Sequence, residues 1–241
     1  MNITTIKFRT YNNKAIYHFE FASVEEMNAS FMRFSEFIES PKYKGKYFER
    51  DNILEYYPDY HETVLGHNIP GDKYKEFLKV FKGKLSLLEK LVINEIRKRN
   101  HIKDFYIIAT PKQKDTDYSS LDHEIAHALY YLYSDYKNTI NSVLEKAGYD
   151  ENDLTSYFTS MYDIVEFKEY DKSVWKDEIH AFLVDLGFGD KGFFYGRSIK
   201  RFFIQLFKRR IRLHFKYQKL AKLIKQIYVN TKSDQLLRIE E

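Results

Sequence analysis

The sequence predicts an α+β protein that is predominantly helical. Apolar residues alternate with polar ones in two stretches near the N-terminus, at residues 3–11 and 15–21, and a third apolar run occupies residues 105–110. Such stretches are typical of β-strands. Most of the remaining chain carries apolar residues at spacings of three and four, which indicates amphipathic helices. We therefore expect one small sheet accompanied by several helices.

The first two strands are expected to form a hairpin that leads into a helix. Residues 12–14, Asn-Asn-Lys, readily adopt the left-handed conformations of a hairpin turn. Residues 23–26, Ser-Val-Glu-Glu, form a capping-box pattern, and Ser40-Pro41 ends the helix that follows. One face of this predicted helix carries Val24, Met27, Phe31, Phe34 and Ile38.

Residues 41–70 are rich in tyrosine and harder to assign. We expect a short helix at 50–56 and turns at Gly66 and 68–71. The tyrosines of this stretch are Tyr43, Tyr47, Tyr56, Tyr57 and Tyr60. They could line a substrate groove, but tyrosines in such loops more often pack against the body of the protein.

Further helices are expected along the rest of the chain. Their predicted ranges are 72–81, 85–100, 138–147, 151–161 and 175–185. In the second of these, the apolar positions are Leu87, Leu88, Leu91, Ile93 and Ile96. The helix that contains residues 122–129 is expected to end or bend at Asp135-Tyr136.

The composition excludes several classes of protein. The 241 residues include no cysteine, so a disulfide framework is impossible. No apolar stretch approaches the roughly 20 residues that a membrane-spanning helix needs. The N-terminal residues lack a basic segment followed by an apolar run, so we expect no secretory signal and a cytoplasmic location.

An H-E-x-x-H motif carries the strongest indication of chemistry. It comprises residues 123–127, and its two histidines lie on one face of a predicted helix, so both can bind one metal ion. Glu124 lies about 100° further round the helix, where its carboxylate can act as general base toward a water on the metal. The His and Glu content of the chain predicts only about 0.02 such matches by chance. We therefore predict a metal site at His123 and His127, the alternative being a surface helix with two unrelated histidines.

These residues resemble the zincin clan of metallopeptidases, in which a third protein ligand completes the zinc site. In the metzincin branch that ligand is a histidine shortly after a glycine, but Tyr130 and Ser134 occupy those positions here. In the gluzincin branch it is a glutamate on a later helix. The resemblance covers roughly a sixth of the chain. It implies a zincin-like fold with the sheet beside the motif helix, a zinc cofactor, and hydrolysis of protein or peptide substrates.

Glu178 is the glutamate that the gluzincin resemblance indicates as third ligand. It lies 51 residues beyond His127, and a small residue, Ala181, follows it as in several gluzincins. His180 is an alternative ligand, but it points about 200° away from Glu178 round the helix, so the two cannot both bind well. Asp135 or an acid between Asp163 and Asp171 could also serve as the third ligand.

The residue that orients the zinc-bound histidines is left open by the sequence. In familiar gluzincins an acid one turn after the glutamate has this role, whereas Phe182 stands there in this chain. Asp177, Asp185 and Asp122 are the candidates that remain.

Tyrosines are candidates to donate a hydrogen bond to the developing oxyanion. Tyr195 lies in a glycine-rich stretch, residues 186–196, that forms either a mobile flap beside the site or a plain connector. Tyr130 and its neighbour Tyr131 are equally plausible donors, because they follow the motif on the same helix.

A basic C-terminal arm completes the chain. Residues 191–232 contain thirteen Lys and Arg and no acid, so the remainder carries a net charge of −9 within a total of +4. Residues 197–229 predict a long amphipathic helix. We expect a catalytic domain at 1–190 and the arm at 191–241, packed on that domain. The alternative to a zinc metallopeptidase is a non-catalytic protein whose arm binds nucleic acid, an acidic partner or an anionic membrane surface.

Overall fold

The computed structural model describes residues 7–11, 15–58, 60, 64–82, 84–98, 104–112, 119–147, 174–187, 211–235 and 239–240. The chain forms two compact units, one of residues 1–114 with 235–241 and the other of residues 115–234. The predicted boundary at residue 190 lies outside the described residues. The predicted α+β class with a predominance of helix is confirmed.

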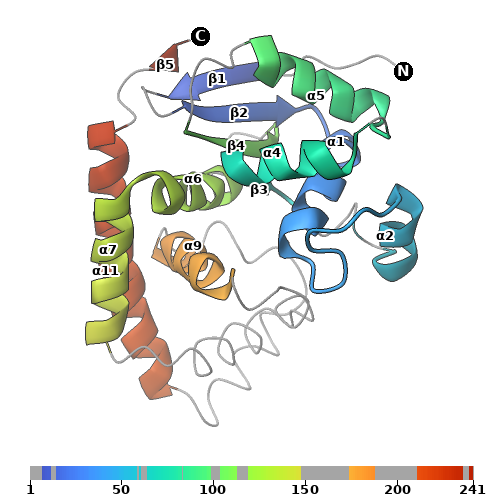
Figure 1. Ribbon diagram of the computed structural model, residues 1–241. Coiled ribbons are helices and arrows are strands. Elements are labelled where there is room, and N and C mark those ends of the chain that lie inside the picture. The colour runs from blue at the N-terminus through green and yellow to red at the C-terminus, as the bar shows by residue number, and fades with distance from the viewer. Residues whose placement is uncertain are drawn as a thin grey trace. The chain divides into compact units, whose positions relative to one another are not determined.

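A five-stranded mixed sheet forms the centre of the first unit (Figure 1), with the order β3-β4-β2-β1-β5. The predicted hairpin is confirmed as β1 (Lys7–Tyr11) and β2 (Ala15–Phe21), with Phe8 opposite Phe19. The third predicted strand is β4 (Phe105–Pro111), which runs parallel to β2 with Ala15 opposite Phe105. The short strand β5 (Ile239–Glu240) pairs antiparallel with β1.

The strand β3 (His67–Pro70) corrects the turns predicted around residues 66–71. It pairs antiparallel with β4, with His67 opposite Ala109. Pro70 is tolerated because it ends a strand at the edge of the sheet, where the missing N–H disrupts no interior ladder. Gly71 follows because a Cβ there would lie 2.6 Å from the carbonyl oxygen of Phe105. Turn-forming residues therefore serve an edge strand and its junction with the next helix.

Helices α1 (Val24–Glu39) and α4 (Gly71–Val80) contact the sheet and cover one of its faces (Figure 1). The predicted start of α1 is confirmed, because Ser23 Oγ accepts a hydrogen bond from the backbone N–H of Glu26. Aromatic rings fill the layer between helices and sheet; Phe77, for example, lies 4.0 Å from Phe34 and 4.1 Å from Phe81, measured between ring centroids. The short helix α2 (Arg50–Tyr56) has the predicted bounds. Tyr43 and Tyr60 are buried, so these loop tyrosines pack against the body of the unit.

The inward face of α5 (Leu87–Lys98) differs from the one predicted. Its buried residues are Glu89, Val92, Ile93 and Ile96, whereas Leu87 is 68% exposed. Glu89 points inward because Arg33 of α1 donates two hydrogen bonds to its carboxylate, from Nε at 2.7 Å and from Nη2 at 2.5 Å. Glu89 also accepts from the backbone N–H of Ser86, and Ser86 Oγ accepts from the N–H of Glu89. This reciprocal pair is a capping box that begins the helix.

A buried network of side-chain hydrogen bonds connects β3 to α1. His67 Nδ1 lies 2.7 Å from Ser35 Oγ, and its Nε2 lies 2.7 Å from Asn28 Oδ1. Asn28 also donates to the carbonyl oxygens of Tyr60 and Val64, which anchors the preceding loop. The imidazole is fully enclosed, and burial lowers the pKa of His67 to about 3. His67 is therefore neutral in the folded protein.

Because His67 stays neutral when folded but titrates with an ordinary pKa of about 6.5 when unfolded, acid destabilises the first unit. The neutral state of His67 makes its full contribution to the free energy of unfolding above pH 6.5, and this contribution is lost as the pH falls toward 3. Between pH 7 and pH 5 the free energy of unfolding is expected to drop by about 2 kcal/mol on this account. Urea unfolding followed by amide exchange in β2 and β4 measures this drop. The variant His67→Gln is expected to lack that part of the slope, and an unchanged slope would contradict the prediction.

The second unit is helical in its described residues. It contains α6 (Ser119–Leu132), α7 (Ser134–Lys146), α9 (Trp175–Gly187) and most of α11 (Ile211–Gln235). The break between α6 and α7 falls at Tyr133, slightly before the predicted Asp135-Tyr136. The predicted helix at 151–161 lies outside the described residues. Among the described helices, none combines the length and apolar character needed to cross a membrane.

Candidate metal centre

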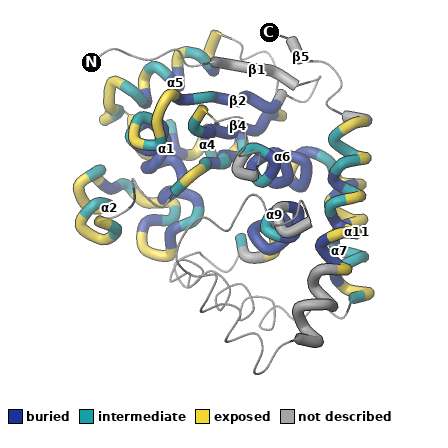
Figure 2. Tube along the Cα trace, turned by 180° about the vertical axis from the view of Figure 1, so that it is seen from behind, coloured by how far each residue is buried: buried dark blue, intermediate teal, exposed yellow. Residues whose placement is uncertain are grey.

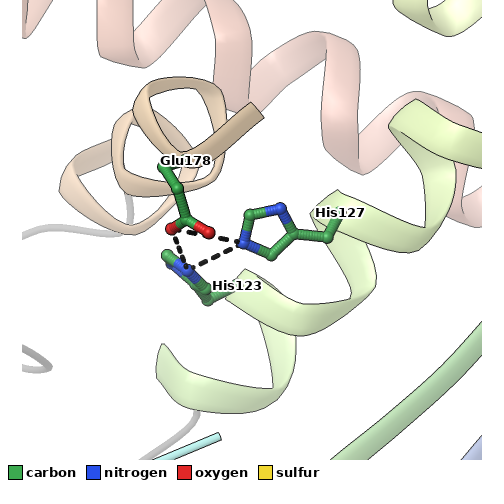
Figure 3. A group of neighbouring side chains, drawn as sticks. All are labelled: His123, His127 and Glu178. Carbon is green, nitrogen blue, oxygen red and sulfur yellow. Dashed lines mark hydrogen bonds and ion pairs between the residues drawn. The ribbon is translucent and has the colours of Figure 1, made fainter. Parts of the chain in front are cut away.

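Two helices of the second unit bring together the predicted metal ligands. His123 and His127 lie one turn apart on α6, and Glu178 lies in the first turn of α9, which packs against α6. Figure 3 shows the three side chains converging on one point. His123 Nε2 and His127 Nε2 are 3.1 Å apart, and Glu178 Oε2 lies 3.8 Å from the first and 3.7 Å from the second. In the described part of the chain these three residues form a group that could hold a metal ion.

The spacing of these three atoms fits a zinc ion. Zinc binds imidazole nitrogen and carboxylate oxygen at about 2.0–2.2 Å, and a tetrahedral arrangement then puts neighbouring ligand atoms about 3.3–3.6 Å apart. The three measured distances bracket that range. Two imidazoles and a carboxylate leave a fourth position for water, as in catalytic zinc sites.

The site is largely buried and favours positive charge. His127 is 0% exposed and Glu178 is 4% exposed, whereas His123 is partly exposed. Figure 2 shows that much of α6 and α9 is buried. Burial alone lowers the pKa of His127, but the carboxylates of Asp177 and Glu178 outweigh it and raise the pKa to about 9. The same electrostatic environment attracts a divalent cation to the Nε2 side of His127.

Asp177 holds the opposite side of the His127 ring. Its Oδ1 lies 3.0 Å from His127 Nδ1, so the imidazole is braced on its second nitrogen while Nε2 faces the other ligands. Burial disfavours the charged form of Asp177, but the charge of His127 and contacts with His127 and His180 lower its pKa below the usual range. Asp177 is one of the three acids that the sequence left open for this role, and it contacts His127; the side chain of Asp185 lies outside the described residues. The carboxylate fixes the tautomer and the orientation of the ring.

His123 is held differently. The ring of Phe182 meets the His123 imidazole edge-on, with centroids 4.9 Å apart. Phe182, one turn after Glu178 on α9, therefore contributes an aromatic contact to this histidine. The two motif histidines are therefore supported by different residues of the same helix, α9.

Glu124, the predicted general base, is also largely buried, at 5% exposure. It follows His123 directly on α6. The helix turns this face inward because a stripe of apolar residues beside Glu124 is buried. That stripe comprises Ile125, Ala128, Leu129 and Leu132.

His180, the alternative third ligand, faces away from the two motif histidines. Its Nε2 lies 2.7 Å from the hydroxyl of Tyr136 on α7, and its ring stacks on Tyr130 at 5.0 Å. Of the two candidate residues on α9, Glu178 is therefore the one whose side chain meets His123 and His127.

Of the predicted oxyanion donors, Tyr130 is described by the structure and Tyr195 is not. The Tyr130 hydroxyl donates to Asn141 Oδ1 of α7 at 2.8 Å, so the structure gives its proton a partner outside the ligand group. Burial raises the pKa of Tyr130 to about 12. Tyr195 and the glycine-rich stretch around it lie outside the described residues.

The C-terminal helix contacts the start of α6. Its buried residues are Leu220, Ala221, Ile224 and Tyr228. Tyr228 donates its hydroxyl proton to Asp122 Oδ1 at 2.5 Å, and Lys232 Nζ lies 2.5 Å from the same oxygen. Asp122 directly precedes His123, so α11 braces the turn that carries the first ligand. Asp122 lies in the first turn of α6, and no local sequence pattern indicated that Tyr228 or Lys232 would contact it.

The expected nucleic-acid role of the basic arm stays a prediction. Lys219 and Lys222 are exposed on α11, whereas Lys232 is engaged with Asp122. The later part of the helix predicted at 197–229 is confirmed as α11, and residues 197–210 lie outside the described residues. Comparison with known protein families, with curated protein sequences and with solved structures found no match for this chain.

Proposed function

We propose that the protein is a zinc-dependent metallopeptidase with a zincin-like fold and a gluzincin-like site. The observation that carries the proposal is the convergence of His123 Nε2, His127 Nε2 and Glu178 Oε2 within 3.1–3.8 Å of one another. The H-E-x-x-H spacing adds Glu124 to the two histidines. Cytoplasmic protein or peptide substrates are part of the same proposal.

Each residue has a distinct role in the proposed reaction. His123, His127 and Glu178 would hold zinc, which when bound supplies a Lewis acid that polarises a carbonyl and acidifies water. Glu124 would take a proton from the attacking water and deliver it to the leaving amine. Asp177 would keep the His127 ring in the orientation that directs Nε2 to the zinc.

Metal analysis of the purified, untagged chain by mass spectrometry tests the proposal. We expect about one zinc per chain in the wild type. Loss of Glu178 removes one of three ligands, so Glu178→Ala is expected to weaken zinc binding by roughly two orders of magnitude or more. His127→Ala should do the same, whereas Glu145→Ala, an exposed acid on α7, serves as the unaffected control. A wild type that takes up no zinc when supplied with it would overturn the proposal. Iron or manganese bound in place of zinc would instead change the identity of the proposed metal.

A further inference from the structure

His180 is a buried imidazole that the proposed reaction does not use. It is 0% exposed, and the rings of Tyr130 and Tyr136 enclose it with centroids 5.0 Å and 5.4 Å away. Burying a polar ring without hydrogen bonds costs free energy, so its two nitrogens need partners. Its Nε2 lies at hydrogen-bond distance from the Tyr136 hydroxyl on α7, and its Nδ1 faces the Asp177 carboxylate on its own helix at the longer distance of 3.7 Å.

We propose that Tyr136 and His180 form an outer positioning layer of the metal centre, which holds Asp177 and through it His127. The inference rests on the proposed zinc site. Its contacts run from α7 to the metal ligand: Tyr136 OH lies 2.7 Å from His180 Nε2, and His180 Nδ1 lies 3.7 Å from Asp177 Oδ1. Asp177 Oδ1 in turn lies 3.0 Å from His127 Nδ1.

The direction of the protons in this chain is determined by its outer end. Tyr136 is buried, and among the described residues His180 Nε2 is the acceptor within reach of its hydroxyl. A phenol keeps its proton at neutral pH, so Tyr136 donates and His180 Nε2 accepts. The proton of the neutral His180 ring is then on Nδ1, facing Asp177. Asp177 Oδ1 faces the Nδ1 atoms of both rings, at 3.0 Å from His127 and 3.7 Å from His180, and His127 Nε2 faces the other two proposed ligands.

The layer also connects helices that supply different parts of the site. His127 lies on α6, Asp177 and His180 lie on α9, and Tyr136 lies on α7. Asp177 faces two imidazoles through one oxygen, so its position depends on both. Loss of outer partners of a metal ligand typically weakens metal binding by about 10–100-fold. For Tyr136, one step further out than Asp177, we expect the lower end of that range, roughly tenfold.

The test compares two tyrosines that pack on the same imidazole. Tyr136→Phe removes the hydroxyl that contacts His180, whereas Tyr130→Phe removes one that donates to Asn141 instead. Zinc affinity of the intact chain, measured by competition with a chelating dye, should fall roughly tenfold in Tyr136→Phe and stay within about twofold in Tyr130→Phe. Thermal unfolding of the metal-free proteins controls for a general loss of stability. Equal zinc affinity of the two variants would overturn the inference while leaving the metal centre intact.

A second measurement does not depend on zinc. Nuclear magnetic resonance of the metal-free wild type, labelled with ¹⁵N in its histidine rings, reports which nitrogen of His180 carries the proton. We expect the Nδ1–H tautomer in the wild type and a change of tautomer population in Tyr136→Phe. An Nε2–H tautomer in the wild type would reverse the proton direction and overturn the positioning role. A wild type that binds no zinc would instead end both the inference and the proposed function.

Discussion

Replacement of Glu124 with glutamine is expected to lower peptide turnover by about two to four orders of magnitude while zinc stays bound. Glutamine has nearly the shape of glutamate, so the packing of this buried position on α6 is retained. It cannot accept the proton of the attacking water as a carboxylate does. Glu124 is not among the three residues whose atoms converge on the metal position, so the metal content should not change.

A mixture of random peptides is the substrate with which to measure this loss. Mass spectrometry counts the new termini that the zinc-loaded wild type produces over time. Glu124→Gln should produce almost none, and Glu145→Gln, an exposed glutamate on α7, should match the wild type. Equal turnover by Glu124→Gln and wild type would remove Glu124 from the reaction. If the zinc-loaded wild type cleaves no peptide, the proposed peptidase activity is wrong and only the proposed zinc binding remains.

The second large effect concerns the stability of the first unit. Glu89→Gln is expected to lower its free energy of unfolding by about 3–5 kcal/mol, because the buried Arg33 then loses its close counter-charge and keeps only the weaker contact with Glu49, 3.9 Å away and 60% exposed. Burial disfavours the guanidinium cation, but the hydrogen bonds and charge of Glu89 raise the pKa of Arg33 above its ordinary value. Glutamine can still accept from the N–H of Ser86, so the capping box is kept and the loss reports on the ion pair.

An exposed pair on α4 gives the matched control. Lys73 and Glu76 form an ion pair 2.9 Å long with side chains 40% and 49% exposed, and Glu76→Gln should change the free energy by less than about 1 kcal/mol. Urea unfolding followed by amide exchange in β2 and β4 measures both variants. The double variant Arg33→Met with Glu89→Gln should recover much of the loss, since no unpaired charge remains. A loss at Glu89 no larger than at Glu76 would contradict this account.

Elements specified by local pattern were predicted from the sequence. The hairpin, the capped α1, the bounds of α2 and the helices that carry His123 and Glu178 all follow from spacing, capping residues and turn residues. These signals act within a few residues of one another, so a single chain is enough to detect them. The elements that were not predicted depend instead on residues far apart in the sequence. Turn-forming residues obscured β3, whose strand state depends on its pairing with β4, 36 or more residues away.

The sequence by itself identified His123 and His127 as candidate metal ligands, because they share a helical face whatever surrounds them, and it reduced the candidates for a third ligand to a short set. Only the tertiary structure decided which face of α9 meets α6, and this brings Glu178 to the histidines and turns His180 toward Tyr136. The same holds for the buried pair of Arg33 and Glu89 and for the contact of Tyr228 with Asp122. Each contact joins residues at least 44 positions apart, and such pairs are selected by packing and burial, which no local sequence pattern records.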